Sequence, residues 1–235
     1  MRPSNALNTS SEIAETGAPR SSVYKEHPKH VTFPTLEDQI RAHKDVYNHL
    51  QIEPVLELVH HYTDAALPDG ADFWGTIVSC SSGHHLIDTA AATRKLAVVQ
   101  PFNDQTNRLP TTVQRTTAAQ KAFGQLKELQ PYDIHVVAMQ LGRTNLGGRS
   151  VLQRKSVHLA GEYPLGVREV ADMLRLVGRL SSPQDLGIDC SADRFGEREV
   201  PCFFFEDRAI KLGIRDVESI DYSFAEATWF MPGGM

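Results

Sequence analysis

Residues 200–212 constrain the fold more than any other part of the chain. They begin with the apolar run Val-Pro-Cys-Phe-Phe-Phe, which is too short for a helix and contains Pro201, whose missing amide a helix interior would not tolerate. An aromatic run bounded by polar residues is typical of a covered β-strand. Glu-Asp-Arg at residues 206–208 then predicts a turn, and residues 209–212 predict the returning strand. We expect a β-hairpin that buries Phe204 in the core of its domain.

The charge of the chain is unevenly distributed. The formal net charge is −5, yet residues 94–155 hold ten Lys or Arg against three Asp or Glu. Residues 34–73 hold two basic against eight acidic side chains, and residues 161–235 hold eight against fourteen. We interpret these segments as neutralising one another across a folded surface. An acidic chain without interleaved basic and aromatic residues does not favour nucleic acid as a partner.

Composition predicts a soluble, cytoplasmic protein. No apolar run reaches the roughly 18 residues that a membrane span needs, and the first residues, Met-Arg-Pro-Ser, do not lead into the apolar core of a signal peptide. The chain has 3 cysteines, Cys80, Cys190 and Cys202, which are widely separated. An odd number of scattered cysteines argues against a disulfide framework and suits a reducing compartment.

Hydrophobic periodicity divides the chain into three parts. Residues 1–32 are rich in Ser, Asn, Pro and charge, and predict a disordered tail. Residues 33–70 predict an acidic pair of helices. Residues 71–235 predict an α+β domain, with one candidate sub-boundary near residue 160. The expected fold is therefore α+β, with a mixed, largely antiparallel sheet that is covered by one or two helices and preceded by the helical pair.

Local patterns predict individual elements. Thr35 and Pro54 mark the beginnings of the two N-terminal helices. Residues 134–141 are almost continuously apolar and predict a buried central strand. A later helix is expected to be capped by Thr111 or Thr112. Further expected elements are strands near residues 73–78, 96–99, 186–190 and 224–230, and a helix that buries one face over residues 167–177.

The residues after the first expected strand include a candidate nucleophile. Cys80 is followed by small residues and by His84. A thiolate needs a nearby base or positive charge to be populated at neutral pH, and His84 is placed to supply it. However, the spacing matches no thiol-enzyme signature, and a cysteine at a strand end is usually a small buried apolar residue. Cys80 and His84 are therefore the catalytic candidates, and the sequence does not decide whether the protein is an enzyme.

Pairs of adjacent histidines at residues 60–61 and 84–85 do not predict a metal site. Neighbouring side chains on a helix or strand point in different directions, and the i,i+4 spacing of a zinc-binding helix is absent. The sequence also lacks a nucleotide or cofactor motif. We expect no metal and no cofactor.

Residues 142–150 form a basic, glycine-rich segment, Gly-Arg-Thr-Asn-Leu-Gly-Gly-Arg-Ser. Backbone amides freed by glycine, together with guanidinium groups, suit an anion. The candidate ligand-binding residues are Arg143, Arg149, Arg154 and Lys155. The spacing is neither a P-loop nor a dinucleotide fingerprint. A plain turn with solvated arginines is the competing interpretation.

Several short motifs follow one another in the C-terminal third of the chain. They are Pro164-Leu165 before a helix, Val200-Pro201 before the aromatic strand, Lys211-Leu212-Gly213 after the hairpin, and Thr228-Trp229 near the end. In this pattern residues 160–230 resemble a family of mainly actinobacterial proteins that carry a domain of unknown function. Ile214 departs from the pattern, which has tryptophan there. The resemblance implies no activity, because the family has none assigned.

Two classes of function are consistent with the sequence. The first is a non-catalytic binding or assembly module with a protein partner or self-association, because no poised catalytic group is evident and the aromatic strands offer an edge for pairing. The second is an enzyme or sensor for a small anionic or phosphorylated ligand, bound through the basic, glycine-rich segment. Convergence of the predicted basic residues on one pocket would favour the second class.

Overall fold

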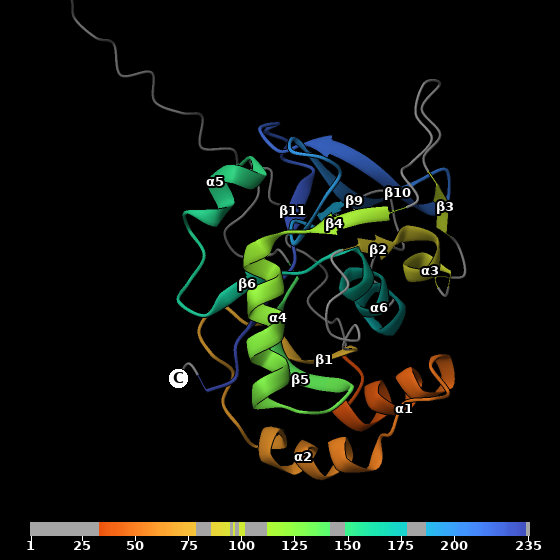
Figure 1. Cartoon of the computed structure of the whole chain (residues 1–235), viewed down its shortest axis with the longest axis vertical. Helices are drawn as coiled ribbons and strands as arrows, with labels where there is room; N and C mark the ends of the chain where they lie inside the picture. Colours follow the sequence, from red (N-terminus) through yellow and green to blue (C-terminus); the bar gives the residue numbers. More distant parts are fainter. Residues whose placement is uncertain are drawn as a thin grey trace, which may run out of the picture. The chain divides into compact units, whose positions relative to one another are not determined.

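Figure 1 shows the arrangement of helices and strands. The computed structural model describes residues 33–78, 86–94, 96, 99–101, 112–141, 149–177 and 187–233, which belong to the compact unit Thr32–Met235. The helices are α1 (Leu36–Val46), α2 (Glu53–Thr63), α3 (Thr89–Thr93), α4 (Thr117–Leu129), α5 (Val151–Lys155) and α6 (Val167–Val177). The strands are β1 (Phe73–Val78), β2 (Leu86–Asp88), β3 (Val99–Pro101), β4 (Thr112–Arg115), β5 (Ile134–Gln140), β6 (Glu162–Pro164), β7 (Gly187–Asp189), β8 (Asp193–Arg194), β9 (Glu199–Glu206), β10 (Ala209–Asp216), β11 (Phe224–Glu226) and β12 (Thr228–Phe230).

The strands form three sheets in which most neighbours are antiparallel. The first sheet has the order β1-β5-β12-β6, the second β11-β7-β9-β10-β3, and the third β2-β4-β8. In the second sheet, β11 runs parallel to β7 and β3 runs parallel to β10. The predicted α+β class with an N-terminal helical pair is confirmed. The strands are divided among three sheets rather than gathered in the one sheet that we expected.

Strand β5 is the predicted buried strand, and all of its residues are buried. It carries apolar side chains on both faces because both faces of the first sheet are covered. Val136 belongs to the same apolar cluster as Ile40 and Val59 of the helical pair. Val137 belongs to the main core, together with Leu174 of α6. Figure 1 shows α1 and α2 packed along the β1–β5 end of this sheet.

Both N-terminal helices begin where the sequence predicts. Thr35 caps α1 by accepting a hydrogen bond from the amide of Asp38 at 3.2 Å. Pro54 lies in the first turn of α2, where a missing amide costs nothing. The following loop turns at Gly70, which has a φ of +88°, a conformation that favours glycine.

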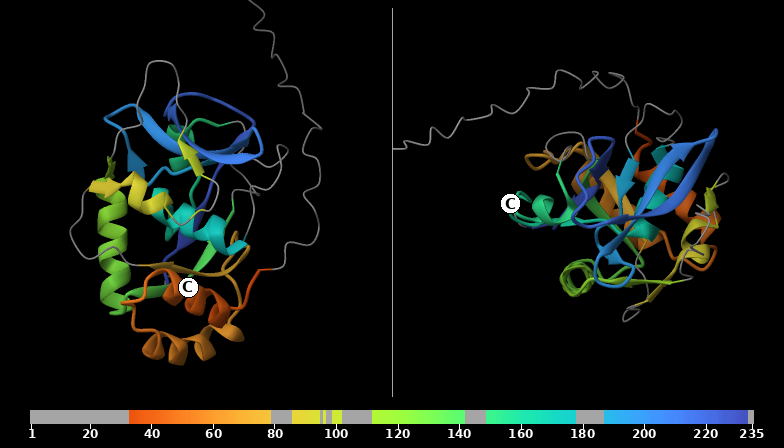
Figure 2. Two further views of the ribbon diagram at one scale, coloured as in Figure 1. Left: turned by 90° about the vertical axis from the view of Figure 1, so that its right-hand side faces the viewer. Right: turned by 90° about the horizontal axis from the view of Figure 1, so that it is seen from above.

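Strands β9 and β10 form the predicted hairpin, and Figure 2 shows it at the end of this unit that lies away from α1 and α2. Its turn consists of two residues, Asp207 and Arg208, with φ values of 52° and 64°. Glu206, which we expected in the turn, is instead the last residue of β9 and pairs with Ala209. Lys211, for which the sequence suggested no partner, contacts the carboxylates of Glu206 at 2.8 Å and Asp207 at 2.7 Å.

The prediction that Phe204 is buried is wrong. Phe203 is the fully buried aromatic residue, with an exposed fraction of 0%, and it pairs with Leu212 on the face that joins the main core. Phe204 is half-buried on the opposite face, where its ring lies 6.2 Å from that of Phe224. A run of three phenylalanines does not show which face is inner, because no polar residue marks the outer one.

The segment before α4 also differs from the prediction. Residues 112–115 form β4, and the helix is capped by Thr116 rather than by Thr111 or Thr112. Val113 of β4 is buried between the neighbouring strands β2 and β8. Strand pairing with distant segments therefore decides the conformation here, as is common for short β-branched sequences.

Two other strands are displaced from their predicted positions. The strand expected at residues 96–99 is β3, which begins at Val99. The strand expected over residues 224–230 is two strands, β11 and β12, which belong to different sheets. The chain changes sheets at Ala227, whose carbonyl accepts a hydrogen bond from the amide of Leu165 at 3.0 Å. This change brings the second sheet next to the first.

Replacing Arg208 with glycine is expected to raise the free energy of unfolding by about 0.5 kcal/mol. The φ of 64° at Arg208 disfavours any residue with a Cβ atom, and Asp-Gly suits a two-residue hairpin turn. Arg208→Ala is the matched control, because it removes the same side chain and keeps the Cβ atom. Denaturant unfolding of both variants checks the prediction, and equal stabilities would contradict it.

Candidate functional site

The predicted site residues are only partly described by the structure. Outside the described residues lie Cys80, His84 and Arg143, and their roles stay predictions. Arg149 is half-buried, and Lys155 is exposed at the end of α5. Arg154 is completely buried, with an exposed fraction of 0%. The described candidates therefore do not share one environment.

Arg154 faces the protein interior because α5 is fixed by a reciprocal capping box between Ser150 and Gln153. Its Nη1 donates to the carboxylate of Asp189 at 2.6 Å, and its Nη2 donates to the carbonyl of Phe224 at 3.0 Å. These hydrogen bonds are made inside the fold. The placement of Arg154 does not support direct contact with an external ligand.

Asp189 is a buried carboxylate that two arginines share. Besides Arg154, it accepts hydrogen bonds from Nη1 of Arg215, the shorter at 2.8 Å. The guanidinium of Arg215 also lies 4.1 Å from the centre of the Phe224 ring. Burial raises the pKa of Asp189, and the two guanidinium groups oppose that rise. This network joins α5, β7 and β10 through charges that would be costly to leave unpaired.

A second buried network joins β4 to the first turn of α6. Arg115 contacts Glu169 at 2.8 Å and Asp193 at 3.1 Å. Glu169 also accepts a hydrogen bond from the amide of Gly166 at 3.1 Å, and Asp193 accepts one from the amide of Val167 at 2.7 Å. Amides at the beginning of a helix have no partner within the helix. A Cβ atom at Gly166 would collide with the carboxylate of Asp193. The network therefore fixes α6 against β4 and β8.

Five polar residues lie near the carboxyl ends of the parallel strands β7 and β11. We call them the β7–β11 polar cluster, and they are Lys155, His158, Ser191, Arg194 and Glu226. Nε2 of His158 lies 2.7 Å from the carboxylate of Glu226. Nη1 of Arg194 donates to two backbone carbonyls, at 2.7 and 2.8 Å. Glu226 and Ser191 have exposed fractions of 0%.

The charged members of this cluster influence one another. Burial lowers the pKa of Lys155 and the guanidinium of Arg194 lowers it further, while Glu226 acts in the opposite direction. Burial also disfavours the protonated form of His158, but the hydrogen bond and charge of Glu226 outweigh it, so the pKa of His158 is raised. Burial lowers the pKa of Arg194, and Glu226 opposes that change. Two cations thus lie close to one buried carboxylate.

Neither Asp189 nor Glu226 was identified as a site residue from the sequence. The alternation that predicts Ile188 on the core face does leave Asp189 on the other face of β7. Asp189 and Glu226 pair across β7 and β11 in the parallel register. An acidic residue in an otherwise apolar strand was the available signal. Its partners could not be inferred, because they come from distant segments.

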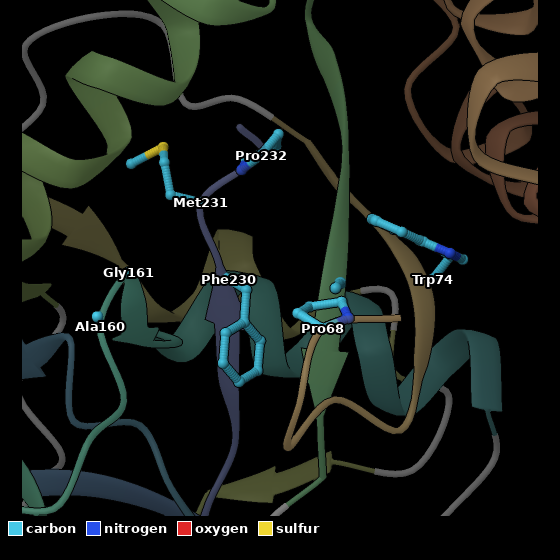
Figure 3. A pocket seen from close by; sticks show the side chains of 8 residues that line it. Pro68, Trp74, Ala160, Gly161, Phe230, Met231 and Pro232 are labelled. Atoms are coloured by element: carbon cyan, nitrogen blue, oxygen red, sulfur yellow. The ribbon is translucent and has the colours of Figure 1, made fainter. Parts of the chain in front are cut away.

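An apolar groove lies on the face of the first sheet on which Val136 packs against α1 and α2 (Figure 3). Its floor is one row across three strands, in which Ala138 lies between Trp74 of β1 and Phe230 of β12. A small residue between two aromatic residues leaves the hollow, whose volume is about 40 Å³. The lining residues are Pro68, Trp74, Ala138, Ala160, Gly161, Phe230, Met231 and Pro232. The groove therefore has room for the end of one apolar side chain.

The edge of the groove is apolar, and acidic residues occur near the lining residues in the sequence. Leu159 has an exposed fraction of 48%. Its side chain and the ring of Phe230 both lie close to Gly70. Asp69 is exposed next to Pro68 in the sequence. No lysine or arginine occurs within two positions of any lining residue. The groove thus has apolar walls, and the chain positions next to them include exposed Asp69 but no basic residue.

Among the described helices, none is long and apolar enough to cross a membrane. Among the described residues, no group of three or more His, Cys, Asp or Glu side chains could hold a metal ion.

Comparison with known proteins gives no relative from which a function could be transferred. The chain matches no protein-family model, no curated protein and no solved structure.

Proposed function

We propose that the protein is a non-catalytic binding module that docks a segment of a partner protein in the apolar groove. The observation that carries the proposal is the row Trp74–Ala138–Phe230, which leaves an aromatic-walled hollow on the face of a sheet. Aromatic residues and methionine are enriched at protein interfaces, and grooves of this kind recognise apolar or proline side chains. Exposed Leu159 extends the apolar contact beyond the hollow.

The border of the groove suggests the chemistry of the partner. The segment that supplies Pro68 and ends directly before Trp74 is residues 34–73, which hold eight Asp or Glu against two Lys or Arg. Complementary charge favours association and suppresses wrong partners. We therefore propose a partner segment with one apolar side chain flanked by lysine or arginine.

A reducing, cytoplasmic setting is part of this proposal. It is supported by Cys190 and Cys202, which are free and buried, because unpaired cysteines persist in reducing compartments. The alternative of an enzyme depends on Cys80 and His84, which lie outside the described residues, and it stays a prediction. The resemblance of residues 160–230 to the actinobacterial family stays a prediction as well.

A peptide titration followed by NMR tests the docking proposal. The probes are ten-residue Gly-Ser peptides with a central leucine that is flanked either by two lysines or by two glutamates. We expect the lysine-flanked peptide to bind about tenfold more tightly at low salt and the difference to shrink at high salt. The chain has 2 tryptophans, which act as internal controls. The indole N–H signal of Trp74 should shift, and that of Trp229, whose exposed fraction is 0%, should not.

A pair of matched variants locates the binding surface. Leu159→Ser at the groove edge is expected to weaken binding of the lysine-flanked peptide by about fivefold, because it removes apolar contact area. Ile220→Ser is the control, since Ile220 is also largely exposed, at 54%, and lies in the segment between β10 and β11. Equal losses in the two variants, or binding that leaves the Trp74 signal unchanged, would overturn the proposal.

A further inference from the structure

The β7–β11 polar cluster contains buried polar atoms without hydrogen-bond partners. In the described part of the chain, seven buried side-chain atoms lack a partner, and four of them lie in or beside this cluster. They are Oγ of Ser191, Nη2 of Arg194, Oε1 of Glu226 and Nη2 of Arg215. Ser191 and Glu226 are 0% exposed, and Arg194 is 9% exposed. Buried polar groups are normally paired, so a concentration of unpaired ones calls for partners from outside the chain, such as a bound ion or ordered water.

The position of the cluster in the fold is also suited to a ligand. Glu226 and Asp189 are the last residues of two adjacent parallel strands, β11 and β7. The loops that follow the carboxyl ends of parallel strands commonly form binding sites. Ser191 and Arg194 follow β7, and Nη1 of Arg194 donates to the carbonyl of Ser191 at 2.8 Å. His158 lies 2.7 Å from the carboxylate of Glu226, three residues after exposed Lys155. Glu226 acts electrostatically on both Lys155 and Arg194.

We infer that the β7–β11 polar cluster is a binding site for a phosphate group that carries a proton. Nη2 of Arg194 and the ammonium group of Lys155 are donors, and both favour an anionic oxygen. Oε1 of Glu226 accepts hydrogen bonds, so it requires a donor on the ligand. A hydrogen phosphate group supplies acceptors for the two cations and an O–H for the carboxylate. The hydroxyl of Ser191 can take either role.

This site goes beyond the proposed docking function and uses none of the residues that line the groove. It also differs from the basic, glycine-rich site expected from the sequence, from which it keeps Lys155 alone. Arg154 and Arg215 pair with Asp189, and His158 contacts Oε2 of Glu226. Oε1 of Glu226 is therefore the acceptor of the cluster that has no partner among the described residues.

Comparison of phosphate with sulfate tests the site. The full chain is titrated at about pH 5.5, where inorganic phosphate and a phosphate monoester such as glycerol phosphate both carry a proton. Isothermal calorimetry at constant ionic strength compares these two ligands with sulfate. Sulfate has the shape of the ligand but carries no proton at this pH, so it would leave Glu226 facing an oxygen without hydrogen. We expect phosphate to bind at least tenfold more tightly than sulfate. If the monoester binds, the ligand of the site is a phosphorylated molecule. If the monoester does not bind, the ligand is the free phosphate ion.

Two variants make the assignment specific. Glu226→Gln replaces an acceptor by a group that can donate, so it is expected to bring the affinities for sulfate and phosphate within about threefold of each other. Lys155→Met should weaken phosphate binding by about tenfold, whereas Lys121→Met on α4, also an exposed lysine, should leave it unchanged. If Glu226→Gln fails to fold, the lysine pair and the sulfate comparison still decide the outcome. The inference is overturned by equal binding of phosphate and sulfate to the unmodified chain, by equal losses in the two lysine variants, or by no binding of phosphate at millimolar concentration.

Discussion

Replacing Asp189 with alanine is expected to lower the free energy of unfolding by about 3–5 kcal/mol, because it leaves buried cations without their counter-charge. Asp189 pairs with Arg154 at 2.6 Å and Arg215 at 2.8 Å, and the side chains of Arg154 and Asp189 are 0% exposed. In the variant, water cannot replace the lost carboxylate without opening the packing around β7. Urea unfolding at neutral pH measures the effect.

The matched control for this prediction is Asp216→Ala. Asp216 also pairs with an arginine, Arg198, at 3.4 Å, but the two side chains are 46% and 66% exposed. Solvent screens such a pair, so the expected loss is at most about 1 kcal/mol. Similar stability losses in the two variants would show that the Asp189 network does not behave as a buried one.

The contrast between these two aspartates explains why the site was less predictable than the fold. Local pattern is sufficient for α1, β5 and the β9–β10 hairpin, because a cap, an apolar run and an aromatic run each occur within a few neighbouring residues. Exposure and pairing are set by distant segments. The sequence marks Asp189 only as an acidic residue in an apolar strand. It does not show that Asp189 meets Arg154 and Arg215, whereas Asp216 stays near the surface.

The same limitation explains the errors in predicted elements. Residues 112–115 form a strand because β2 and β8 pair with them, and neither strand is adjacent in the sequence. Phe203 and Phe204 are chemically identical, and the sheet that receives the hairpin decides which one is buried. The groove could not be predicted without the register of the strands, since Trp74, Ala138 and Phe230 come from strands that are far apart in the chain.

A different polar network, between α1 and α6, should make two pH-dependent contributions to stability that offset each other. His43 is buried between Oγ1 of Thr76, at 2.9 Å from its Nε2, and Nη2 of Arg175, at 3.0 Å from its Nδ1. Burial and the charge of Arg175 lower the pKa of His43 from 6.5 to about 3. Burial raises the pKa of neighbouring Asp172 from 3.8 to about 6, although Arg175 and the hydroxyl of Tyr47 oppose that rise.

These two groups affect stability with opposite signs. The unfolded chain protonates histidine at a higher pH than the native state does, so the contribution of His43 is complete above pH 6.5 and is lost as the pH falls toward 3. Asp172 binds its proton more tightly in the native state, so its contribution is complete below pH 3.8 and is lost as the pH rises through 6. Between these limits each slope is about 1.4 kcal/mol per pH unit, and the two nearly cancel.

Single variants should therefore reveal the slopes that the native pair conceals. Relative to the unmodified chain, Asp172→Asn is expected to gain about 2 kcal/mol of stability as the pH rises from 4 to 6, and His43→Gln to lose about as much over the same range. The double variant is the control, and its difference from the unmodified chain should be nearly independent of pH. Denaturant unfolding at several pH values measures all four proteins. Slopes of the same sign in the two single variants would contradict the assignment, because it requires a neutral His43 and a protonated Asp172 to coexist in the native state near pH 5.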